Sequence, residues 1–182
     1  TALILAISDD DVTRELWPYK FELMQTLILD EQGLSIALDV HNRTDSSMVF
    51  TAALHSYLRV PDVRTCSLNG LNGCEYEDAA DNGRVKTETG ELRIQAEVDR
   101  VFADAPKSLS LRRDSLPDLH ISQGGFADTV VWCPGPVLAS TFTDMPADDW
   151  KSMLCVEAAA AAQPVTLLAN DHWQGWQKLG FA

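Results

Sequence analysis

Basic residues are scarce in this chain of 182 residues. Lys and Arg number 14 against 27 Asp and Glu, which gives a formal net charge of −13. Nucleic acids and anionic membranes are bound through clustered Lys and Arg, so the charge balance argues against both as partners. An anionic ligand would need a local basic pocket, for which the candidate residues are Arg59, Arg64, Arg100, Arg112 and Arg113.

Long apolar runs are also missing. The N-terminal run Ala2–Ile7 is much shorter than the ~20 residues that a membrane-spanning helix needs. It also lacks the basic start of a secretory signal peptide. The sequence therefore predicts neither a membrane span nor a signal peptide, and we expect a cytoplasmic location.

The motifs that hold common cofactors are absent. The four cysteines form no CxxC pair, so zinc is not expected. Cys66 and Cys74 flank a glycine-rich turn and could meet, although four free thiols in a reducing cytoplasm is the simpler interpretation. The chain contains no glycine-rich nucleotide loop, nucleophile elbow or metal-ligand cluster. We therefore predict no cofactor and no metal.

Helical periodicity is rare, and alternation with period two dominates. Residues 34–40 place Leu and Ile side chains on one face and polar side chains on the other, and residues 92–99 alternate in the same way. Turn-forming residues separate such segments at 30–33, 42–47, 69–73, 81–83 and 123–125. The pattern predicts an all-β fold, a large antiparallel sandwich. Length and the lack of a linker predict one domain over 1–182.

Only two short segments favour a helix. Residues 147–151 follow Pro146, and the alanine run 158–162 has high helix propensity. The alanine run also follows a strand-like segment and precedes Pro164, so a loop is an equally good interpretation for it.

Three strand-like segments each carry one group suited to proton transfer or hydrogen bonding, namely His55, Asp99 and Glu157. If the strands are regular, His55 lies opposite Leu54, Asp99 lies opposite Val98, and Glu157 lies opposite its apolar neighbours. The three side chains can then emerge from one concave sheet face. An imidazole and carboxylates together indicate acid-base chemistry on a neutral group.

The sequence of these segments resembles that of the aldose 1-epimerase superfamily. It resembles more closely the branch that acts on hexose 6-phosphates, the glucose-6-phosphate 1-epimerase family. The resemblance covers nearly the whole chain and rests on several segments in the same order. These segments are 17–18, 50–55, 70–73, 98–101, 128–132, 144–146 and 153–157.

The resemblance implies a galactose mutarotase-like supersandwich and a cofactor-free interconversion of sugar anomers. In this interpretation Glu157 is the base, His55 is the acid, and Asp99 binds the hydroxyl groups of a hexose or hexose 6-phosphate. The family pattern begins upstream of Thr1, with a further histidine and phosphate-contacting arginines. We therefore expect the chain to correspond to the C-terminal two-thirds of the family fold.

Two alternatives stay open. The chain could be a catalytically inactive member that binds a carbohydrate or a protein, because groups that the family supplies upstream are missing. It could also be a fragment of an active enzyme, with an exposed sheet edge that favours a homodimer or aggregation.

We assign no functional role to the other candidate residues. Trp132 follows a run of valines and is predicted to be buried without a functional role. We expect His41, His120 and His172 at the surface, and turn capping or salt bridges explain Asp128 and Asp144 as well as ligand contacts would.

Overall fold

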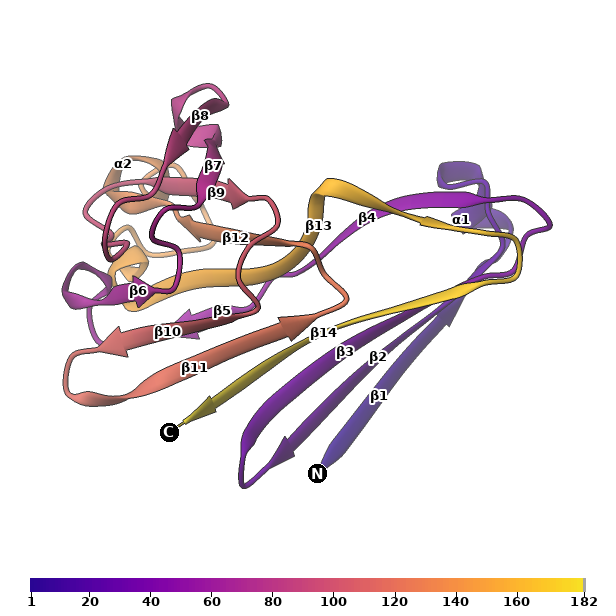
Figure 1. Cartoon of the computed structure of the whole chain (residues 1–182), viewed down its shortest axis with the longest axis horizontal. Coiled ribbons are helices and arrows are strands. Elements are labelled where there is room, and N and C mark those ends of the chain that lie inside the picture. The colour runs from indigo at the N-terminus through magenta and orange to yellow at the C-terminus, as the bar shows by residue number, and fades with distance from the viewer. Residues whose placement is uncertain (182) are drawn as a thin grey trace.

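The computed structural model describes residues 1–181, and Ala182, the last residue of the expected domain, lies outside the described residues. Strands dominate the chain and form two antiparallel sheets that face each other (Figure 1). The predicted antiparallel β-sandwich is confirmed. Within residues 1–181, no helix is long and apolar enough to cross a membrane.

The first sheet contains the N-terminal strands and the last strand of the chain. Its strand order is β1 (Ala2–Ser8), β2 (Phe21–Asp30), β3 (Gly33–Asn42), β14 (His172–Phe181), β11 (Leu116–Gly124), β10 (Ser108–Arg113) and β6 (Ser67–Asn69). The N-terminal strands lie on one side of this sheet, and β14 joins them to β11 (Figure 1).

The second sheet is built around the long strand β13. Its order is β4 (Met48–Leu54), β13 (Met153–Leu167), β12 (Asp128–Cys133), β9 (Val98–Phe102), β7 (Glu75–Asp78) and β8 (Arg84–Thr87), and β5 (Tyr57–Arg59) also pairs with β13. Short helices fill the connections: α1 (Asp11–Leu16), η1 (Val63–Thr65), η2 (Ala79–Asp81), α2 (Gly135–Ala139) and η3 (Asp149–Ser152).

Alternation predicted some strands better than others. Residues 34–40 lie in β3 as predicted, and the turn segments lie at the ends of strands, although Gln123 and Gly124 still belong to β11. The strand prediction for residues 92–97 is wrong, because β9 begins only at Val98. Leu92 and Ile94 are buried, yet of these residues only Leu92 forms a bridge, to Leu68. The alternation there reflects packing of an irregular segment on the core.

The alanine run 158–162 is neither helix nor loop but part of β13. Ala158 and Ala160 pair with β4 and pack with Leu54 and Phe126. Burial between neighbouring strands has overridden the intrinsic helix propensity of alanine. The other predicted helix survives only as the short 3₁₀ helix η3.

A buried carboxylate shapes β13 just beyond this run. Between Ala160 and Val165 the register with β4 shifts, which marks a bulge. The Oδ2 atom of Asp128, a fully buried residue, accepts hydrogen bonds from the backbone N–H groups of Ala161, Ala162 and Gln163 at 2.8, 2.7 and 3.1 Å. Asp128 therefore fixes the bend of the strand that carries Glu157.

The hydrophobic core lies between the two sheets near β9–β13, where Phe102, Leu111 and Val131 are fully buried. The face of β1–β3 is covered much less. Leu3 and Ile7, which pair with Leu27 and Leu23, remain 53% and 52% exposed. Apolar alternation in these strands therefore continues beyond the area that the second sheet covers.

Candidate active site

Strand register gathers the candidate residues on one face of the second sheet. Tyr57 pairs with Cys155, Cys155 with Trp132, and Trp132 with Asp99, so one row crosses β5, β13, β12 and β9. Directly paired residues point to the same face of a sheet. Glu157 follows Cys155 by two residues and therefore shares that face.

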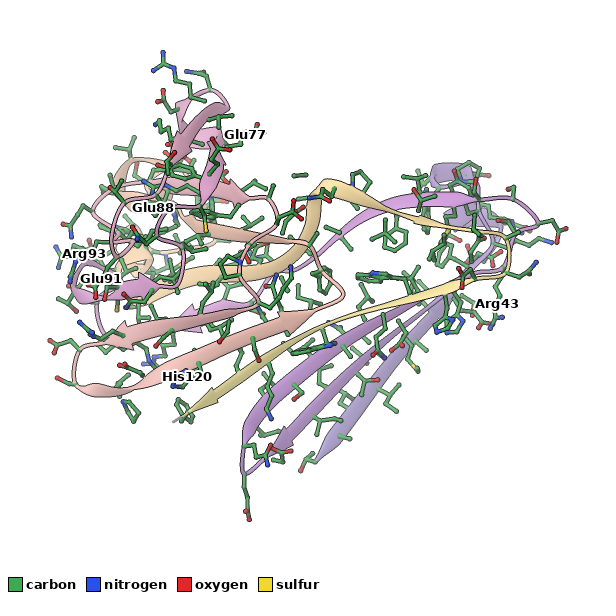
Figure 2. All side chains as sticks on the ribbon, in the orientation of Figure 1. Arg43, Glu77, Glu88, Glu91, Arg93 and His120 are labelled. Carbon is green, nitrogen blue, oxygen red and sulfur yellow. The ribbon has the colours of Figure 1, made fainter. Side chains whose placement is uncertain are left out.

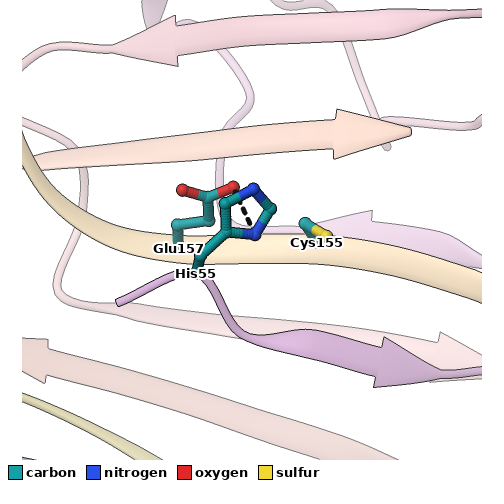
Figure 3. A group of neighbouring side chains, drawn as sticks. All are labelled: His55, Cys155 and Glu157. Carbon is teal, nitrogen blue, oxygen red and sulfur yellow. Dashed lines mark ion pairs between the residues drawn. The ribbon is translucent and has the colours of Figure 1, made fainter. Parts of the chain in front are cut away.

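The sequence had suggested that His55 lies within a regular strand. The structure instead places it between two strands. Strand β4 ends at Leu54 and β5 begins at Tyr57, and a backbone hydrogen bond from Ser56 to Leu54 closes a tight turn at His55. The turn brings the imidazole over β13, where its Nδ1 atom lies 3.3 Å from Oε1 of Glu157 (Figure 3). The His55 side chain is 50% exposed and that of Glu157 only 6%.

A glutamine from the opposite sheet holds both partners in place. Gln177 on β14 is fully buried. Its Oε1 atom accepts a hydrogen bond of 2.6 Å from the Ser56 hydroxyl, and its Nε2 atom donates one of 3.0 Å to the Val156 carbonyl. Ser56 follows His55 and Val156 precedes Glu157, so Gln177 bonds to the neighbour of each, through a side-chain hydroxyl at Ser56 and a backbone carbonyl at Val156. No sequence motif pointed to Gln177.

The two carboxylates sit in a setting that disfavours their charged forms. Burial raises the pKa of Glu157, the nearby His55 opposes this effect, and Asp99 adds to it. Burial also raises the pKa of Asp99, with a smaller contribution from Asp78. A base with a raised pKa accepts a proton more readily near neutral pH.

A purely structural role for Asp99 would predict a surface ion pair with its neighbour Arg100. Asp99 does not form this ion pair. The Arg100 guanidinium instead contacts Glu88 at 2.5 Å and lies 4.5 Å from the centre of the Tyr76 ring. Within the described part of the chain, Asp99 forms no ion pair. Its half-buried carboxylate is therefore free to accept hydrogen bonds from a ligand.

The prediction that Trp132 is buried is wrong. Trp132 is partly exposed, and its ring meets His55 and Tyr57 edge to face at centroid distances of 5.9 and 6.3 Å. The valines before it alternate, and the register turns Trp132 to the face opposite the core residue Val131. Tyr57 stacks on His55 at 4.7 Å.

A hollow opens beside the rings of Tyr57 and Trp132. Its volume of about 490 Å³ is within the usual range for small-molecule sites. It is lined by Tyr57, Trp132, Phe142, Asp144, Met145 and Met153. Asp144, whose role the sequence left open, thus lines this hollow, whereas His55, Asp99 and Glu157 are not among its lining residues. A slightly larger hollow of about 520 Å³ lies between β3 and β4, but its lining contains no titratable side chain and offers no acid-base chemistry.

The other three histidines lie away from the His55–Glu157 pair. His120 on β11 is exposed, and Figure 2 shows it on the first sheet. His172 is exposed as well, whereas His41 is half-buried and stacks on His172 at 5.4 Å. All four cysteines are free thiols within the described residues, so Cys66 and Cys74 do not form the disulfide that their spacing allowed.

Comparisons with known proteins identify relatives of this chain. A protein from Cenchrus ciliaris named "Putative glucose-6-phosphate 1-epimerase" is 30% identical over 178 residues, which are 95% of this chain and 54% of that protein. A protein of the same name from Escherichia coli is 28% identical over 165 residues, with 89% and 54% of the two chains covered. The chain thus spans about half the length of the curated relatives it matches.

Solved structures show the same fold. The crystal structure of a "putative mutarotase" from Salmonella typhimurium superposes with a TM-score of 0.87 at 23% identity, over 100% of this chain and 61% of that one. A galactose mutarotase-like protein from Lactobacillus casei gives 0.76 at 16% identity, over 100% and 70% of the chains. Residues 1–180 match the family model described as "Aldose 1-epimerase". The chain therefore belongs to the aldose 1-epimerase family.

Proposed function

We propose that this protein interconverts the α and β anomers of an aldohexose by paired proton transfer between the sugar, Glu157 and His55. The observation that carries the proposal is the 3.3 Å contact between His55 Nδ1 and Glu157 Oε1, on a sheet face that also bears Asp99. The family membership and the names of the relatives support the same reaction type.

The reaction needs two proton carriers side by side. Glu157 removes the proton from the anomeric hydroxyl while a protonated His55 donates one to the ring oxygen, so the C1–O5 bond breaks and an open-chain aldehyde forms. After rotation about C1–C2 the two groups reverse roles and the ring closes. Both oxygens are bonded to the anomeric carbon, so acid and base must be neighbours, as these side chains are. Each group contributes a rate factor of about 10²–10⁴.

Asp99 and Trp132 orient the sugar in this proposal. The half-buried carboxylate accepts hydrogen bonds from ring hydroxyls, and the partly exposed indole offers an apolar surface beside the hollow. Orientation of a substrate against its catalytic groups supplies much of the advantage of an acid-base enzyme.

We further propose that the substrate is a hexose 6-phosphate and that Arg59 contacts its phosphate. Arg59 is exposed, follows Tyr57 by two residues on the same strand face, and pairs with Met153, which lines the hollow. It forms no ion pair within the described residues. A guanidinium group is well suited to a phosphate, and it would offset locally the net charge of −13.

The test is polarimetry or exchange NMR on freshly dissolved α-glucose 6-phosphate, glucose and galactose. We expect Glu157→Gln and His55→Ala each to lower turnover by about 10²–10⁴, and Asp99→Asn to act mainly on KM. Arg59→Gln should slow only the phosphorylated sugar. Arg84→Gln, on the distant β7–β8 hairpin, serves as the matched control.

Each outcome has a consequence for the proposal. Full activity in Glu157→Gln would rule out Glu157 as the base. Equal effects of Arg59→Gln on phosphorylated and unphosphorylated sugars would rule out the phosphate contact. No acceleration of any sugar by demonstrably folded protein would favour a carbohydrate-binding or protein-binding module without activity.

A further inference from the structure

We propose that the same site binds one Zn²⁺ ion through His55, Cys155 and Glu157, and that the ion blocks sugar turnover. One ligand atom from each residue lies within 4.8 Å of the other two, and Figure 3 shows His55 between the two β13 side chains. The inhibitory part of this proposal rests on the proposed function, whereas the binding part does not.

The ligand set suits zinc in its chemistry, and one of its pairs already has the spacing of zinc ligands. Imidazole nitrogen, thiolate sulfur and carboxylate oxygen are its common protein ligands, at about 2.0–2.3 Å from the metal, so two ligands on a tetrahedral ion lie roughly 3.5 Å apart. The His55 and Glu157 atoms are already 3.3 Å apart. The half-exposed imidazole can adjust toward the sulfur, which leaves the fourth position for water.

Cys155 has no other task in the proposed chemistry. It is fully buried and paired with Tyr57 on one side and Trp132 on the other, on the face that carries the site. Coordination turns its thiol into a thiolate, and the proton leaves to water. The two charges of the ion then balance one thiolate and one carboxylate, so the occupied site carries no net charge in a buried position.

Spacing rules could not reveal this site. Motif searches for zinc look for ligands close together in the sequence, such as CxxC. Here the turn at His55 brings an imidazole onto β13 from a distant segment, and the two β13 ligands are two residues apart on one strand face. An ion held there occupies both proton-carrying atoms of the proposed mechanism and would act as an inhibitor.

The first experiment measures metal binding without sugar. Zn²⁺ alone is titrated into the full chain in competition with a chromophoric chelator, and Co²⁺ alone is added to a second sample to record the sulfur-to-cobalt charge-transfer absorption. We expect one tight ion per chain and a clear thiolate band. Cys155→Ala should remove the band and weaken Zn²⁺ binding by more than about 100-fold, which exceeds the loss caused by changing residues that only hydrogen-bond to the metal ligands.

Cys133→Ala is the matched control, because Cys133 is equally buried on the neighbouring strand but faces the core, where its thiol contacts the Trp150 carbonyl. It should bind both metals like the wild type. If Cys155→Ala fails to fold, His55→Ala gives the same comparison, since its half-exposed side chain lies outside the core. Unchanged Zn²⁺ affinity in the folded Cys155 or His55 variant, or no thiolate band in the wild type, would overturn the proposed site.

The second experiment adds sugar and separates the two proposals. Zn²⁺ should abolish anomerisation by the wild type and by Cys133→Ala, but not the activity that Cys155→Ala retains. Inhibition of the Cys155 variant at the same Zn²⁺ concentration would contradict the mechanism of inhibition. If the wild type shows no anomerisation, the proposed function fails, and the binding measurements still decide whether the metal site exists.

Discussion

Replacement of Asp128 by alanine should destabilise the protein by about 2–4 kcal/mol. The Asp128 carboxylate accepts three backbone hydrogen bonds in the β13 bulge, and bonds to a charged acceptor contribute roughly 1.5–3 kcal/mol each. Their sum is an upper limit, because Ala161, Ala162 and Gln163 are exposed and their N–H groups can turn to water when the carboxylate is removed. The expected loss is therefore well below that sum.

Urea denaturation with a fixed m-value measures this loss. In a thermal melt it corresponds to a shift of about 2–4 °C per kcal/mol for a chain of this size. Asp128→Asn retains one acceptor oxygen but places an amide at the buried Oδ1 position, which has no partner among the described residues, so it should cost about 1–3 kcal/mol. Asp118→Ala on exposed β11 is the control and should stay within about 0.5 kcal/mol. An Asp128→Ala midpoint equal to that control would refute the reasoning.

Two further predictions concern the site itself. Burial raises the pKa of Glu157, so the folded chain holds this proton more tightly than the unfolded chain, and stability falls as pH rises through the folded pKa. Glu157→Gln should therefore melt higher than the wild type at pH 8, with the gap closing toward about pH 4, the range of an unperturbed glutamate; a gap independent of pH would contradict this. Trp132→Ala should raise KM for the sugar about tenfold with a smaller effect on kcat, since an aromatic contact contributes up to about 1.5 kcal/mol. Phe181→Ala, 63% exposed at the end of β14, should leave KM unchanged, and equal KM values for the two variants would argue against a sugar platform at Trp132.

Local pattern predicted the sheets where cross-strand pairing supported it. Residues 34–40 form β3 with a partner on each side, because β2 and β14 both pair with them along the whole segment. The same pattern failed at residues 92–97, because an irregular segment can bury alternate side chains without a neighbouring strand. Alternation reports which side chains are buried and not whether the backbone is paired.

The site was predictable only in part, for a related reason. Short motifs indicated His55, Asp99 and Glu157, and register places the two acids on one sheet face. The contributions of Trp132 and Gln177 depend on which strands are neighbours or face each other. Secondary-structure propensity carries no information about that. The valines before Trp132 indicated a buried strand, but only its register with β9 and β13 shows which face each residue takes.

Gln177 makes the spacing between the two sheets a property of the proposed reaction centre. The side chain is anchored in the first sheet and bonds to the Ser56 hydroxyl beside His55 and to the Val156 carbonyl beside Glu157, the proposed proton-carrying pair in the second. A change that slides or tilts β14 would pull on both attachments together and so alter the alignment of His55 with Glu157. Mutations that alter packing in the first sheet, remote from any sugar, should therefore change turnover before they unfold the protein.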